Sequence, residues 1–109
     1  MLSNGVRPGV VGLVRSLATQ LGPEGITVNR VAPGFTATER VTEIVAARAG
    51  REQRSPEEVE AGITAQIPVG RMGAPEEQAA VVAFLASARA GFLTGQTIVV
   101  DGGQHRGLL

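Results

Sequence analysis

The most informative stretch of this sequence is Val28–Thr38, which reads VNRVAPGFTAT. The β-branched and apolar run Ile26–Ala32 predicts a short strand, and the Pro-Gly pair after it ends that strand. Its apolar residues do not alternate strictly, which favours a strand covered on both faces, as parallel strands usually are. Ligands in open α/β sheets bind beyond the carboxyl ends of the strands. The loop after this strand is therefore the first place to look for a site.

Helices are predicted on both sides of this stretch. Apolar residues at helical spacing predict a helix over Pro8–Leu21, which a Gly-Pro pair ends. Residues 37–68 are more polar and predict two short helices, the first ending at Gly50 and the second capped by Ser55. Such a segment resembles a surface flap, for which we expect few buried contacts and mobility.

The last third of the chain predicts one more helix and one more strand. The helix begins near Pro75, and over Ala79–Ala86 it is apolar on every side. A helix that is apolar all round must be buried all round, and in so small a chain we expect the cover to come from outside it. Thr97–Val100 predicts the second strand, with Asp101–Gly103 as the turn after it.

The order helix, strand, two helices, helix, strand predicts an α/β fold with one parallel crossover unit. A sheet of only two strands is marginally stable by itself. Parallel sheets are also normally extended at their edges and covered on both faces. We therefore expect either a fragment of a larger sheet or a chain that completes its sheet by oligomerising.

Composition excludes several classes of function. The 109 residues include ten basic and ten acidic side chains, no cysteine, and only three aromatic residues, all Phe. Without a basic stripe, no nucleic-acid partner is expected. His105 is the only histidine, so no metal site is expected either. No leader segment or membrane-spanning run is apparent, which predicts a soluble cytoplasmic protein with no membrane partner.

Four segments together give the sequence a likeness to a known family. In chain order they read GVVGLVRSLA at 9–18, VNRVAPGFTAT at 28–38, GRMGAPEE at 70–77 and LTGQTIVVDGG at 93–103. Each is a weak match alone, but all four in this order and spacing resemble the C-terminal half of a short-chain dehydrogenase/reductase. The resemblance implies a partial Rossmann-like, doubly wound parallel sheet over 1–109, with 37–68 as a substrate lid.

The family's activity is hydride transfer between NAD(P) and a small carbonyl or alcohol substrate. In the family, a Tyr acts as acid and base, and a Lys four residues later lowers the pKa of the Tyr and holds the nicotinamide ribose. The register of the resemblance puts Ser3 at the Tyr position and Arg7 at the Lys position, and the chain has no Tyr. A Ser hydroxyl is too weak an acid for this task at neutral pH. Arg7 retains the positive charge and the donors that a ribose needs.

The resemblance also implies cofactor contacts in the loop after the first strand. The matching positions are Pro33, Gly34, Phe35, Thr36 and Thr38, with Thr38 at the position of the family's Thr that meets the nicotinamide carboxamide. An aliphatic residue is usual where Thr36 stands. No two glycines in the chain are two residues apart, so the Gly-x-Gly-x-x-Gly turn of the family's phosphate-binding half is absent.

The family's subunit contacts predict a homo-oligomer through residues 75–87 and 97–100. Three interpretations of the isolated chain stay open. The chain is either an inactive portion of an oxidoreductase, or a non-catalytic oligomerisation or interaction subunit, or a truncated gene product. An enzyme of another class has no support, since the sequence shows no paired carboxylates and no nucleophile next to a base.

Overall fold

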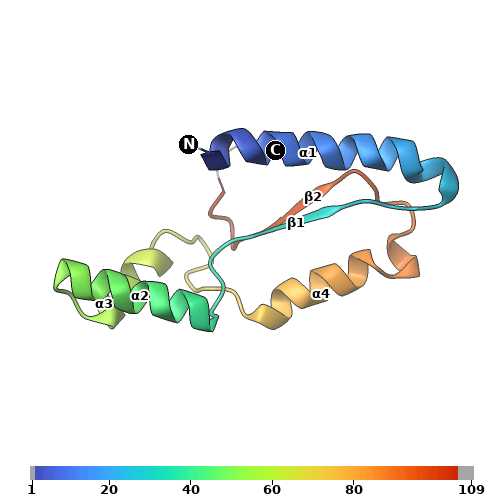
Figure 1. The fold of residues 1–109 in the computed structure, drawn as a ribbon. Coiled ribbons are helices and arrows are strands. Elements are labelled where there is room, and N and C mark those ends of the chain that lie inside the picture. Colours follow the sequence, from blue (N-terminus) through green and yellow to red (C-terminus); the bar gives the residue numbers. More distant parts are fainter. Residues whose placement is uncertain (1, 106–109) are drawn as a thin grey trace. The chain divides into compact units, whose positions relative to one another are not determined.

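The computed structural model describes the backbone of residues 2–105 and the side chains of residues 9–105. The elements in Figure 1 follow the predicted order of helix, strand, two helices, helix and strand. Their bounds are α1 Leu2–Leu21, β1 Arg30–Pro33, α2 Glu39–Glu52, α3 Pro56–Thr64, α4 Pro75–Leu85 and β2 Thr97–Val100, with short 3₁₀ turns at Gly22–Glu24 (η1) and Ala88–Ala90 (η2). The second strand has the predicted bounds, and α4 begins at the predicted proline.

The chain is made of two compact units. Within the described residues, one unit contains 2–32 and 80–98, and the other contains 33–79 and 99–105. Strands β1 and β2 pair in a two-stranded sheet. The Arg30 N–H donates to the Gln96 carbonyl at 2.8 Å, and the Gly34 N–H donates to the Val100 carbonyl at 3.0 Å. Both residue numbers rise together along this register, so the strands are parallel and the predicted α/β fold class is confirmed.

Strand β1 begins four residues later than predicted, because side-chain bonds interrupt the regular backbone ladder before Arg30. The Val28 N–H donates to the Thr94 hydroxyl at 3.0 Å. The Asn29 amide donates to the Leu93 carbonyl at 3.1 Å and accepts from the Gln96 N–H at 3.1 Å. Each of these three bonds involves a side-chain atom, although the Gly95 N–H also donates to the Val28 carbonyl at 2.7 Å. The β-branched pattern does not reveal such side-chain bonds.

Helix α1 is longer than predicted, since it begins at Leu2 and passes through Pro8. A proline inside a helix keeps a helical φ, but it removes one hydrogen bond and its ring crowds the carbonyl four residues before it, at a cost of about 3 kcal/mol. The apolar stripe is confirmed at Val14 and Ala18, which are buried, and is wrong at Leu13, which is 56% exposed.

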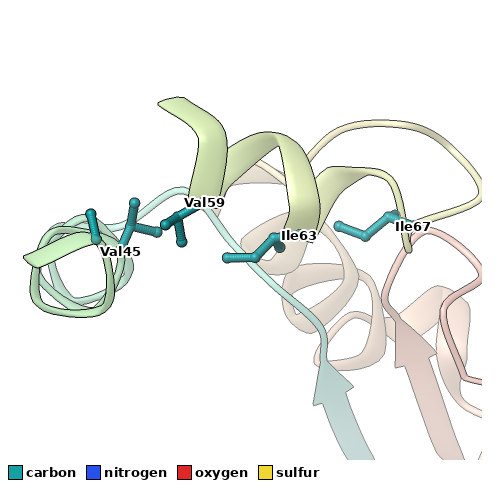
Figure 2. Close-up of a cluster of buried hydrophobic side chains, with 5 residues drawn as sticks. Val45, Val59, Ile63 and Ile67 are labelled. Carbon is teal, nitrogen blue, oxygen red and sulfur yellow. The ribbon is translucent and has the colours of Figure 1, made fainter. Parts of the chain in front are cut away.

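Helices α2 and α3 contain the main buried apolar cluster of the described residues, so the expectation of few buried contacts for this flap is wrong. Val45 on α2 faces Val59 on α3, and the cluster continues along α3 and beyond its end (Figure 2). Its members are Val45, Ala49, Val59, Ile63 and Ile67. An apolar residue occurs about every fourth position in both helices, and pairing them gives each stripe a partner.

The ends of α2 and α3 show one wrong and one correct prediction. Helix α2 runs through Gly50 to Glu52, and its C-cap residue Gln53 adopts the left-handed conformation with φ 53°. Helix α3 begins as predicted, because the Glu58 N–H donates to the Ser55 hydroxyl at 3.1 Å and the hydroxyl donates back to the Glu58 carboxylate at 3.2 Å.

Helix α4 is apolar but not buried in the described part of the chain. Val82 is 53% exposed and Phe84 is 47% exposed. Because these side chains are exposed here, the expectation that something outside the chain covers this helix stays a prediction.

Candidate functional site

The candidate site begins where β1 and β2 end, and a glycine is required there by close backbone approach. A Cβ built on Gly34 would lie 2.6 Å from the Asp101 Cβ and 2.8 Å from its Cα. Real Cβ atoms do not approach backbone so closely, so any larger residue must push the strand ends apart. The Pro33-Gly34 pair predicted from the sequence therefore fixes how the two strand ends meet.

The loop that follows Gly34 is held by a second backbone pairing. Thr36 forms an isolated parallel bridge with Gly73. In it the Gly73 N–H donates to the Phe35 carbonyl at 2.9 Å, and the Ala37 N–H donates to the Gly73 carbonyl at 2.8 Å. Two separate points of the chain, β2 and Gly73, thus fix the predicted cofactor loop.

The two threonine hydroxyls of this loop have different partners. The Thr36 hydroxyl donates to the Gly34 carbonyl at 3.3 Å, within its own loop. The Thr38 hydroxyl oxygen accepts from the Val41 N–H at 3.3 Å and caps α2. This cap was missed from the sequence, although a Thr three residues before an apolar helical position is a signal for it. The cap uses an acceptor lone pair, so the hydroxyl hydrogen of Thr38 remains available to a ligand.

Gly73 is positioned by an ion pair at the start of α4. The Arg71 guanidinium binds both oxygens of Glu77, at 2.7 and 3.0 Å. The same carboxylate accepts from the Ala74 N–H at 2.8 Å. The hydrogen bonds from Arg71, followed by the one from Ala74, lower the pKa of Glu77 to about 2. The sequence indicated only that acidic residues suit this helix start, because the pairing with Arg71 spans six positions outside any regular period.

We expect this corner to be sensitive to acid, because the pKa of Glu77 is lower in the folded chain than its ordinary value of 4.5. The carboxylate stabilises the fold fully above pH 4.5, and that contribution is lost as the pH falls through about 2. Replacing Glu77→Gln removes the charged partner of Arg71. The variant should therefore lose less stability than the wild type between these pH values, as measured by urea unfolding. An identical pH dependence in both proteins would contradict the role of Glu77.

One further side chain of α4 reaches the strand ends. The Gln78 amide donates from Nε2 to the Val100 carbonyl at 2.8 Å. Gln78 also lines a small cavity of about 110 Å³ together with Phe35, Gly73 and Asp101. No sequence signal pointed to Gln78, because its partner lies 22 residues away.

The segment after β2 forms the predicted turn. The Asp101 carboxylate accepts from the Gly103 N–H at 2.9 Å and from the His105 N–H at 2.8 Å. Gly102 and Gly103 have φ of 66° and 92°, a left-handed conformation that suits glycine. A Cβ on Gly102 would lie 2.7 Å from the Ile67 side chain. The turn is therefore packed against the segment that follows α3.

For the predicted catalytic pair, the structure describes the backbone but not the side chains. Ser3 and Arg7 belong to the backbone of α1, and their side chains lie outside the described residues. The structure brings the five predicted cofactor positions into one loop at the carboxyl ends of both strands. Among residues 2–105, no cluster of His, Cys, Asp or Glu suitable for a metal ion is found.

The donor set of this loop fits a carboxamide group. Among the described residues, the N–H groups of Phe35 and Thr36 donate to no backbone carbonyl. The Thr38 hydroxyl, which accepts from Val41, can also donate its hydrogen to a ligand. A carboxamide oxygen accepts such donors, and a carboxamide NH₂ donates to carbonyl groups. No glycine-rich turn that fits a pyrophosphate occurs in the sequence.

Known proteins match this chain over most of its length. The family model described as enoyl-(acyl carrier protein) reductase matches residues 3–105. The short-chain reductase protein NovJ of Streptomyces niveus is 48% identical over 95 residues, which is 87% of this chain and 35% of NovJ. The 3-oxoacyl-[acyl-carrier-protein] reductase FabG of Haemophilus influenzae is 45% identical over 99 residues, which is 91% of this chain and 36% of FabG.

A solved structure supports the same relationship. The NADPH-dependent reductase YwfH, which is involved in bacilysin biosynthesis, superposes with a TM-score of 0.84 at 37% identity, covering 93% of this chain and 38% of YwfH. The chain spans about a third of the length of the curated relatives it matches. No helix within residues 2–105 is long and apolar enough to cross a membrane. The fold, the four motifs and these matches show that the chain belongs to the short-chain dehydrogenase/reductase family.

Proposed function

We propose that this chain forms the nicotinamide side of an NAD(P)-dependent short-chain oxidoreductase, as the C-terminal part of that enzyme. The observation that carries the proposal is the loop Gly34–Thr38, which is fixed at the carboxyl ends of both strands with donors left over. The names of two relatives add support, since FabG is a 3-oxoacyl-[acyl-carrier-protein] reductase and YwfH is an NADPH-dependent reductase. The substrate class we propose is a small carbonyl compound or the matching alcohol.

In this proposal the nicotinamide supplies or accepts the hydride, and the residues of the chain hold it in place. The Phe35 and Thr36 N–H groups and the Thr38 hydroxyl bind the carboxamide and so set the orientation of the ring. Arg7 binds the ribose, and Ser3 occupies the acid position. The lid 37–68 closes over the substrate and excludes water, which its own buried cluster allows it to do as a unit.

The isolated 109-residue chain should not turn over. It contains no Tyr to exchange the proton and no Gly-x-Gly turn to hold a pyrophosphate. A homo-oligomer through 75–87 and 97–100 and a cytoplasmic location belong to the same proposal.

A nuclear magnetic resonance titration of the ¹⁵N-labelled chain tests the proposed role of the loop. Reduced nicotinamide mononucleotide should shift the amide signals of Phe35, Thr36 and Thr38 with a dissociation constant on the order of 1 mM. NADPH should bind no tighter, because its two additional phosphates and its adenosine meet no subsite in this chain. Ribose 5-phosphate serves as the ligand control and should leave these signals unchanged.

Two substitutions at Thr38 separate its cap from its proposed ligand contact. Thr38→Asp keeps a strong N-cap but removes the hydroxyl donor, whereas Thr38→Ser keeps both. Thr38→Asp should therefore retain α2 and weaken nicotinamide binding, and Thr38→Ser should bind as the wild type does. If millimolar ligand shifts no amide signal in the loop, the proposed role of the loop is wrong. If NADPH binds with micromolar affinity, the claim that the chain lacks a phosphate subsite is wrong.

A second candidate function, a non-catalytic assembly subunit, is favoured by the apolar surface of one unit. Val82 and Phe84 on α4 are about half exposed, and Phe92 beyond α4 is fully exposed. An assembly subunit would bury such side chains against its partner, since burial of apolar surface drives association. This candidate predicts a discrete folded oligomer by light scattering together with no response of the loop to reduced nicotinamide mononucleotide.

A further inference from the structure

The carbonyl of Val100 connects two parts of the candidate site. It accepts the Gly34 N–H at 3.0 Å and the Gln78 Nε2 at 2.8 Å. A backbone carbonyl has two lone pairs, so both bonds form together. One oxygen atom at the end of β2 thus fixes the first residue of the loop Gly34–Thr38 and a side chain from the first turn of α4.

The orientation of the Gln78 amide follows from this bond. Its Nε2 faces the Val100 carbonyl, and the reverse orientation would place two acceptor oxygens against each other. The Gln78 Oε1 is shielded from solvent and has no hydrogen-bond partner among the described residues. Within residues 2–105 the Gln78 side chain therefore hydrogen-bonds only to the Val100 carbonyl, which belongs to the candidate site.

The opposite side of the loop is held independently of Gln78. The Gly73 backbone pairs with Phe35 and Ala37, and the Arg71–Glu77 ion pair fixes the segment around Gly73. Glu77 and Gln78 are neighbours on α4, so one turn of this helix controls the loop at two points. Loss of the Gln78 bond should free the Gly34 end and leave the Gly73 end in place.

We propose that Gln78 is a positioning residue for the loop Gly34–Thr38, acting through the Val100 carbonyl. This inference rests on the proposed function, because it assigns Gln78 to the placement of the donors that meet the nicotinamide carboxamide. Gln78 itself touches no reacting atom.

Amide hydrogen exchange in the 109-residue chain tests this role without any ligand. Gln78→Met keeps the length of the side chain and removes the donor, so the Gly34 amide should exchange about five to ten times faster. Amides of the buried cluster, such as that of Ile63, should keep their wild-type rates. Gln66→Met is the matched control, since Gln66 is exposed and should leave Gly34 unchanged.

A second variant keeps the test decisive if Gln78→Met loosens the whole unit. Gln78→Glu places a carboxylate, which has no donor, against the Val100 carbonyl. Burial raises the pKa of such a carboxyl group, and its protonated form donates an O–H bond. Arg71, Glu77 and Asp101 are the charged groups lining the same cavity, and each already has a partner.

In Gln78→Glu the protection of Gly34, corrected for intrinsic exchange, should rise towards the wild-type value as the pH falls from about 8 to about 5. A general loss of stability would not be restored in this way. Unchanged Gly34 protection in Gln78→Met, or a Gln78→Glu profile that runs parallel to the wild type, would overturn the inference.

The ligand titration separates this inference from the proposed function. Reduced nicotinamide mononucleotide should bind Gln78→Met about five to ten times more weakly than the wild type, while Gln66→Met should bind normally. A wild type that shows no response to the ligand would overturn the proposed function. Full affinity in Gln78→Met would overturn the positioning role alone.

Discussion

Gly34→Ala should lower the free energy of unfolding by about 1–3 kcal/mol, because the new Cβ would lie 2.6 Å from the Asp101 Cβ. The atoms in the way belong to the backbone and Cβ of Asp101, which cannot rotate aside as a long side chain can. The strand ends must separate, and the bond from the Gly34 N–H to the Val100 carbonyl must lengthen. Urea unfolding followed by circular dichroism measures the loss.

Gly62→Ala is the matched control, since Gly62 is an exposed residue of α3 with nothing within 4 Å of a built Cβ. Alanine is the better helix former, so this variant should gain about 0.5–1 kcal/mol. Opposite signs for the same chemical change would show that the cost at Gly34 comes from the close approach. A neutral Gly34→Ala would contradict the described meeting of the strand ends.

Restoring the family's acid and its cationic partner should have the largest effect on activity. We consider a graft in which residues 3–105 replace the matching segment of the H. influenzae FabG. With Ser3 and Arg7 in place, the graft lacks a phenol for proton exchange. The double substitution Ser3→Tyr with Arg7→Lys should raise kcat by about 10²–10⁴-fold, the usual contribution of general acid–base catalysis. Steady-state oxidation of the reduced nicotinamide cofactor measures this gain.

The two single substitutions give the control for this gain. Arg7→Lys alone should leave kcat low, because the Lys acts by lowering the pKa of a Tyr that is still missing. Ser3→Tyr alone should recover part of the activity, since Arg7 supplies a positive charge of its own. Equal activity of the original and doubly substituted grafts would show that Ser3 and Arg7 do not occupy the Tyr and Lys positions.

Sequence reasoning succeeded where the determining contacts are local. The Ser55 cap of α3 was visible because its bonds join residues three apart. The bounds of β2 followed from a short β-branched run between turn residues. The Pro33-Gly34 terminator was also correct, but its reason, the close approach to Asp101, became apparent only from the structure.

The missed features depend on contacts between distant positions. The start of β1 shifted because Asn29 bonds to both ends of Leu93–Gln96, more than sixty residues away. The sequence pattern does not give the length of α1, because a proline such as Pro8 is typical of a helix start and here lies inside the helix. The packing of α2 on α3 depends on the apolar stripes of both helices together, and each stripe by itself is a weak pattern in the sequence.

The candidate site also has a part that the sequence predicts and a part that it does not. Its loop was found from the strand end and the family resemblance, because both are patterns of consecutive residues. Its supports were not found, since Glu77 and Gln78 act through Arg71 and Val100 at separations that match no helical or strand period. Thr38 is the exception, because its place three residues before an apolar helical position is a local capping signal.

The most direct test of the central claim is a graft of Pro8–His105 in place of the matching segment of the H. influenzae FabG, with the host's own Tyr and Lys retained. If the loop Gly34–Thr38 holds the nicotinamide as proposed, the graft should reduce the host's substrate with kcat/KM within about 10²-fold of the host, the cost of a misplacement of about 1 Å. A folded graft that neither binds the reduced cofactor nor turns over would contradict the claim.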